Sequence, residues 1–114
     1  MTTLAGEFLL NLLEQDRVWV TRDGRRLVLE EMEWSHRRNV LAMLERQMAG
    51  LYREWLTEFL DEGVTLEELA RLGWVAEDPL TGRYRPAGAR TWFEGQPLVV
   101  RLRALLVPAA SASA

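Results

Sequence analysis

Cysteine is absent from this chain of 114 residues, and histidine occurs only once, as His36. Without thiols the chain can form no disulfide, no thiolate zinc site and no cysteine nucleophile. A metal site would need His36 together with carboxylates, and neither a second histidine nor a regular spacing of acidic residues supports one. We therefore expect neither a metal ion nor any other cofactor.

Long apolar runs are also absent, and we expect no leader sequence at the start of this chain. No stretch approaches the roughly 18 uninterrupted apolar residues of a membrane-spanning helix. Residues 1–3 include no basic residue, and Glu7 and Asn11 interrupt the apolar run that follows, which is unlike a signal peptide. We expect a cytoplasmic protein without a membrane partner, located in the bacterial host cytosol if a phage encodes it.

Lysine is missing as well, so all 14 basic residues are arginine, against 17 acidic residues. The net charge of −3 disfavours general nucleic-acid binding, which depends on neutralising phosphates. The charges are spread unevenly, because residues 54–78 hold eight acids and one arginine, whereas residues 83–103 hold five arginines and one acid. This pattern indicates either two solvated faces or a polar interaction surface.

The composition, 48% hydrophobic and 27% charged, is typical of a folded domain rather than a disordered chain. We predict one α+β domain over residues 1–107 and a disordered low-complexity tail at 108–114. The predicted elements are an N-terminal helix at 3–15, a β-hairpin at 18–29, a long helix at 35–60, a short helix at 66–72 and a C-terminal antiparallel β-meander. The meander consists of one hairpin at 74–85 and another at 91–103.

Local signals support the predicted helices. Leu41, Leu44 and Met48 recur at spacings of three and four, which places them on one face of the long helix. Gly63 suits the C-terminal cap of that helix. Thr65 and Glu68 have the spacing of a capping box at the start of the short helix.

The register of the first hairpin follows from its turn. Asp23-Gly24 suits a two-residue turn with positive φ, which pairs Val20 with Leu27. This register places Trp19 and Val28 on one face, beside Arg26. The residues on the opposite face, predicted to point toward the core, are Val18, Val20, Leu27 and Leu29.

In the second predicted hairpin of the meander, the alternation of residues assigns the faces. Leu98, Val100 and Leu102 are expected to point toward the core. Arg101 and Arg103 then point outward, and Trp92 lies on the face opposite the core.

The segment from Trp19 to Arg46 resembles a group of small, mostly uncharacterised proteins from phages, prophages and bacteria. Their shared signature is a hairpin followed by a helix that opens near a Met-x-x-x-His-x-x-Asn segment. The match covers about a quarter of the chain and implies a phage or mobile-element context, with no known activity or catalytic residues to carry over. Arg37 departs from the pattern, which often has leucine after the histidine. The matching residues are Trp19, Thr21, Asp23, Gly24, Met32, His36 and Asn39.

Residues 69–85 are similar to the end of a recognition helix and the wing of winged-helix regulators. The resemblance implies nucleic-acid contacts by Arg83, Arg85 and Arg90 on the wing. The preceding helix is long, however, and the candidate recognition helix carries Glu67 and Glu68 where phosphate would approach.

Catalytic chemistry finds little support in the sequence. Ser35 and His36 are adjacent, so a helix turns them about 100° apart and they do not form a nucleophile–base pair. Adjacent glutamates such as those at 30–31 and 67–68 do not face one another across a cleft, as glycosidase chemistry requires. Glycine-rich nucleotide motifs are also missing. We expect no enzymatic activity.

Five tryptophans exceed what a small core normally needs, and aromatic side chains with arginines are enriched at protein interfaces. Alternatively, helices of the same chain cover both faces of each hairpin. The interface candidates are Trp19, Arg26, Val28, Trp92, Arg101 and Arg103.

These inferences predict a non-enzymatic protein-binding accessory or inhibitor protein of phage or mobile-element type. Its partner is another protein or a second copy, the latter in a symmetric dimer through the long helix. One alternative is a winged-helix-like nucleic-acid-binding regulator. Another is a small structural component of a phage or larger complex.

Overall fold

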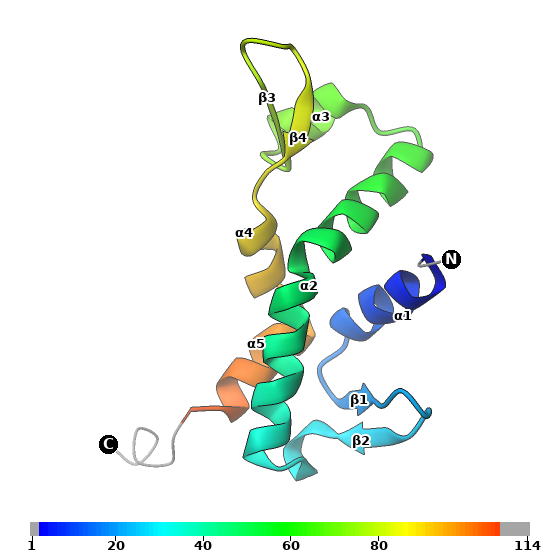
Figure 1. Cartoon of the computed structure of the whole chain (residues 1–114), viewed down its shortest axis with the longest axis vertical. Helices are drawn as coiled ribbons and strands as arrows, with labels where there is room; N and C mark the ends of the chain where they lie inside the picture. The colour runs from blue at the N-terminus through cyan, green and yellow to red at the C-terminus, as the bar shows by residue number, and fades with distance from the viewer. Residues whose placement is uncertain (1–2, 108–114) are drawn as a thin grey trace.

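One long helix, α2 (Trp34–Asp61, 28 residues), runs through most of the molecule and carries the other elements along its length (Figure 1). The structure is a computed structural model that describes residues 3–107, with side chains from residue 8 onward. The molecule measures 49 × 37 × 19 Å along its principal axes. The shortest dimension corresponds to about two packed helices, so the fold is a thin slab.

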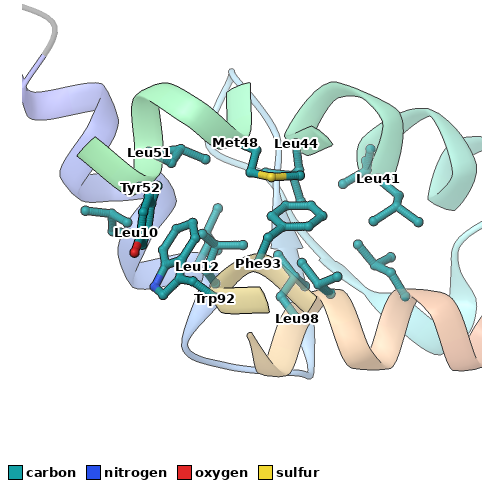
Figure 2. Packing of buried hydrophobic residues seen from close by; sticks show 14 of the residues in the cluster. Leu10, Leu12, Leu41, Leu44, Met48, Leu51, Tyr52, Trp92, Phe93 and Leu98 are labelled. Carbon is teal, nitrogen blue, oxygen red and sulfur yellow. The ribbon is translucent and has the colours of Figure 1, made fainter. Parts of the chain in front are cut away.

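The buried side of α2 follows from the helical spacing of its apolar residues. Three helices pack against the α2 helix: α1 (Thr3–Leu13), α4 (Ala89–Glu94) and α5 (Pro97–Leu105). Figure 2 shows Leu44 and Met48 of α2 next to Phe93 of α4. We call the buried contacts of α1, α4 and α5 with α2 the main core. The buried residues of α2 are Val40, Leu41, Leu44, Met48, Leu51, Tyr52 and Leu56.

The first hairpin forms as predicted but in a different register. Strands β1 (Val18–Val20) and β2 (Arg26–Val28) pair antiparallel. Trp19 lies opposite Leu27, whereas the sequence placed Val20 opposite Leu27. The predicted register is therefore wrong by one residue.

The loop of this hairpin explains the shift, because it contains three residues rather than two. The Thr21 N–H donates to the Arg25 carbonyl (2.8 Å), and Gly24 has a φ of +88°. This is the arrangement of a three-residue loop that ends in a glycine bulge. The one-residue shift turns β1 over relative to β2. Trp19, predicted to face away from the core, is therefore buried, whereas Val28 of β2 is exposed as predicted.

The second hairpin of the predicted meander is wrong, because residues 91–103 form most of α4 and α5. Pro97 occupies the first turn of α5, where its missing N–H sacrifices no helical hydrogen bond. Val100, predicted to face the core, is 53% exposed. The buried residues of α5 are Leu98, Val99 and Leu102, which have helical spacing.

A smaller unit lies at the far end of α2 (Figure 1). It consists of α3 (Leu66–Arg71) and the hairpin of β3 (Val75–Glu77) and β4 (Tyr84–Pro86). The first predicted hairpin of the meander is thus confirmed, within one residue at each strand. The predicted capping box is also confirmed, because the Glu68 N–H donates to Thr65 Oγ1 (3.2 Å) and the Thr65 N–H donates to Glu68 Oε2 (2.9 Å).

An aromatic cluster attaches this unit to α2. Neighbouring rings in it have centroids between 4.8 and 6.3 Å apart. The Tyr52 hydroxyl lies within hydrogen-bond distance of the Trp74 carbonyl (2.8 Å) and of the Ala87 carbonyl, so it fixes both ends of the hairpin segment. Burial raises the pKa of Tyr52 to about 12. The rings of the cluster belong to Tyr52, Trp55, Phe59, Trp74 and Trp92.

The predicted α+β class and the long helix are confirmed. Two small antiparallel sheets accompany the helices in residues 3–107. No helix within that range is both long and apolar enough to cross a membrane. The predicted tail at 108–114 lies outside the described residues.

Candidate protein-binding surface

An open pocket of about 310 Å³ lies where the chain passes from β2 into α2. The short 3-10 helix η1 (Leu29–Glu31) makes this connection. It brings the C-terminal end of β2 next to the first turn of α2 (Figure 1). The pocket is lined by Arg26, Leu27, Val28, Glu31, Met32, Glu33 and His36.

Arg37 stabilises the backbone around the pocket. Its guanidinium donates to the carbonyls of Leu29 (2.8 Å) and Glu30 (2.7 Å), and it also reaches the Leu105 carbonyl at the end of α5 (3.3 Å). One side chain therefore connects η1, α2 and α5. In the sequence, Arg37 was noted only because related patterns often have leucine at this position. The guanidinium, with its several hydrogen-bond donors, was the only sequence signal that Arg37 connects these elements.

The floor of the pocket is apolar and the rim is charged. Met32 is the buried residue of the lining, and Leu27 and Val28 of β2 are its other apolar residues. Around them stand Arg26, Glu31, Glu33 and His36. A patch of this kind suits an aliphatic side chain of a partner, flanked by polar groups of either charge.

The rim charges are not engaged inside the chain. Within the described part of the protein, no ion pair is formed by Arg26, Glu31 or Glu33. Their solvated charges can therefore pair with a partner without breaking an internal contact. In this respect the pocket differs from the surface of α5.

On α5, the candidates Arg101 and Arg103 already have partners. Arg101 pairs with Glu30, and Arg103 donates to Glu94 through Nε (2.5 Å) and Nη2 (2.7 Å). Arg103, followed by Arg90, holds the pKa of Glu94 below its usual range. The predicted outward-facing strand is thus a helix whose arginines attach it to neighbouring elements.

Two of the six interface candidates are core residues. Trp19 is 7% exposed and Trp92 is 4% exposed. Trp19 is buried because of the register shift, and Trp92 because its segment is a helix packed on α2 rather than a strand. The alternative that helices cover both faces of each hairpin is wrong as well, because residues 91–103 are mostly helical and Val28 on the first hairpin is 45% exposed. Arg26 and Val28 remain, and both line the pocket.

Trp34 is the exposed tryptophan that the sequence did not single out as an interface candidate. It opens α2 and is 48% exposed. The Arg38 guanidinium lies 5.0 Å from its ring centroid, one helical turn further on. Its Nε1 donates to the Leu106 carbonyl (3.4 Å). The sequence held one signal for this exposure: Trp34 begins the helix, and the residues three and four positions before it are glutamates rather than apolar residues.

The nucleic-acid candidates divide into two groups. Arg83 and Arg85 are exposed on the β3–β4 hairpin. Arg90 lies on α4 instead and pairs with Glu45 (3.3 Å) and Glu94 (3.1 Å). The three arginines therefore do not form one surface free of acids.

Negative charge also surrounds the hairpin. Desolvation raises the pKa of Tyr84, and the carboxylates of Glu77 and Glu67 raise it further. These acids lie near the strand that carries Arg85, where they would oppose the approach of phosphate.

Residues 8–107 bring no three histidine or acidic side chains together in a group that could hold a metal ion. His36 stands at the pocket rim with Glu31 and Glu33 as the nearest acids of the lining. Comparison with protein-family models, curated proteins and solved structures found no match.

Proposed function

We propose that this chain is a non-catalytic protein-binding module of the accessory or inhibitor type, and that it binds through the pocket between β2, η1 and α2. The observation that carries the proposal is the combination of an apolar floor with a rim of charges that lack internal ion pairs. Interfaces derive most of their affinity from a few well-packed anchors, and surrounding polar groups add specificity.

The chemistry of the pocket favours a protein over a small molecule. Sites for small molecules are mostly enclosed and apolar, with a few convergent polar groups. Here the rim is open, and Arg26, Glu31 and Glu33 all extend into solvent. The phage context remains an expectation from the resemblance of residues 19–46.

The experiment compares two exposed valines. Val28→Glu introduces a charge into the pocket, whereas Val100→Glu makes the same change on α5, away from it. Each immobilised variant is exposed to bacterial lysate and its retained proteins are compared with those of the parent. We expect Val28→Glu to lose partners that Val100→Glu keeps. Identical sets for both variants would refute the pocket as the binding site.

Nucleic-acid binding is a second candidate, favoured by the hairpin that follows α3 as a wing follows a recognition helix. With Arg90 engaged in ion pairs, Arg83 and Arg85 would have to supply the phosphate contacts. Binding of this kind weakens steeply as salt rises. Titration of labelled DNA and RNA at low and high salt tests it, and absence of binding at about 50 mM salt excludes it.

A further inference from the structure

The tip of the β3–β4 hairpin presents a single aliphatic side chain on a rigid loop. Leu80 is 93% exposed. Its N–H donates to Asp78 Oδ1 (2.9 Å), and the Gly82 N–H donates to the Asp78 carbonyl (2.8 Å). The loop therefore holds Leu80 away from the body of the chain. Because these bonds already order the tip, a partner would lose little additional loop entropy on binding it.

The charges beside this leucine complement those around the pocket. Arg83 and Arg85 are exposed and form no ion pair in the described part of the chain, and Glu31 and Glu33 are their counterparts at the pocket rim. Each surface also holds a charge of the other sign, Glu77 on β3 beside the tip and Arg26 at the pocket. Polar groups arranged in this way favour one orientation of the two surfaces.

The tip and the pocket of one molecule cannot meet. The hairpin lies at one end of the 49 Å axis, whereas β2 and the start of α2 lie at the other (Figure 1). An aliphatic side chain and the apolar floor of a pocket are thus exposed at opposite ends of the same rigid slab. Only a second molecule can bring the two features together.

We propose that Leu80 of one copy inserts into the pocket of a second copy, with Arg83 and Arg85 against Glu31 and Glu33. This proposal rests on the proposed function, binding through the pocket between β2, η1 and α2, and it identifies a second copy of the chain as the partner. Such a contact is heterologous, so each pair keeps one free tip and one free pocket and association continues with concentration. The surfaces are smaller than a standard interface of about 1,600 Å², so the contact is weak.

Sedimentation velocity over a range of protein concentrations tests this contact. We expect the parent to sediment faster as concentration rises, and Leu80→Asp to remain monomeric. Two charge-reversed variants add specificity: one carries Arg83→Glu with Arg85→Glu at the tip, and the other carries Glu31→Arg with Glu33→Arg at the pocket. Each alone is expected to lose association, because like charges then face one another.

Mixing the two charge-reversed variants tests directly whether the tip of one copy contacts the pocket of another. In the mixture, the tip of each variant meets an oppositely charged pocket on the other, so association is expected to return. A control with Arg46→Glu and Arg53→Glu makes the same charge change as the tip variant on exposed positions of α2, and it is expected to associate like the parent. Circular dichroism of each variant confirms that it is folded.

Three results would overturn the proposal: a parent that stays monomeric at all concentrations, a mixture that does not associate, or a loss of association in the α2 control alone. The last would indicate a dimer through the long helix. If self-association fails while Val28→Glu still loses partners from lysate, the pocket binds a different protein and the proposed function stands. If Val28→Glu keeps those partners, the proposed function fails independently.

Discussion

The two ends of the molecule are stabilised in different ways. At the near end, α1, α4 and α5 pack against α2, so the buried residues come from segments far apart in the sequence. At the far end, α3, β3 and β4 follow one another directly and attach to α2 through the aromatic cluster. Long-range packing thus defines the first end, whereas local signals define most of the second.

The largest effect is expected at the near end, in the main core. Phe93→Ala removes a fully buried ring between α4 and α2, and we expect it to lower the free energy of unfolding by about 3–5 kcal/mol. Urea denaturation measures the loss. Leu80→Ala at the exposed tip is the control, with an expected change of about 0.5 kcal/mol or less. A similar small change for Phe93→Ala would refute the packing of α4 on α2.

The next effect concerns the contact that joins the far end to α2, and it depends on pH. Burial raises the pKa of Tyr52 from 10.0 to about 12, because the neutral phenol is favoured in the folded state. This contribution to stability is fully present below pH 10 and is lost as pH rises toward 12. The two-unit shift corresponds to about 2–3 kcal/mol.

Urea denaturation between pH 9 and 12 tests this expectation. Tyr52→Phe should remove most of the alkaline loss, at a cost near neutral pH of about 1 kcal/mol for the hydrogen bonds to Trp74 and Ala87. Tyr84→Phe is the matched control and should keep the Tyr52 component of the alkaline loss. Equal alkaline loss in the parent and in Tyr52→Phe would contradict the role of the Tyr52 hydroxyl.

Two adjacent valines sharpen the distinction between helix and strand at the near end. Val99 is fully buried and Val100 is 53% exposed, whereas the predicted strand reversed this order. Val99→Ala removes two buried carbons and is expected to lower the free energy of unfolding by about 2 kcal/mol. Val100→Ala should change it by about 0.5 kcal/mol or less. A larger loss for Val100→Ala than for Val99→Ala would favour the predicted strand over the helix.

The smallest effect is expected in the local structure of the far end. Thr65→Ala removes one half of the capping box of α3, with an expected loss of about 1 kcal/mol. Hydrogen exchange should become faster in residues 66–71 and remain unchanged in the main core. Thr57→Ala on α2 is the control, because its hydroxyl only donates to the Arg53 carbonyl within the helix (2.8 Å). A uniform change in exchange would mean that the two ends unfold together.

The sequence predicted local structure well wherever a few neighbouring residues decide it. The capping box at Thr65, the glycine that ends α2 at Gly63 and the hairpin around Pro79 all follow from backbone preferences. For the candidate site, Arg26 and Val28 were identified, because they lie beside an evident turn. The pocket itself was not, since it depends on how η1 folds against α2.

The errors occurred where two structures fit the same local pattern. Asp23-Gly24 suits a two-residue turn, but it also suits the last two positions of a three-residue loop, and burial of Trp19 favours the second register. Residues 98–102 alternate in polarity only in part, so the strand pattern is incomplete. Two adjacent residues of this range, Leu98 and Val99, are both buried, which fits a helix packed against α2. In both cases the larger apolar burial prevailed over local preference.

By itself, the sequence determined the α+β class, the long helix, the capping of α3 and the absence of thiol chemistry, because these follow from residue type and short spacing. Only the tertiary structure decided the face of the first hairpin, the helical state of residues 97–105, the burial of two tryptophans and the pairing of the α5 arginines. These depend on contacts between distant segments, whose burial energy exceeds the small local difference between a strand and a helix.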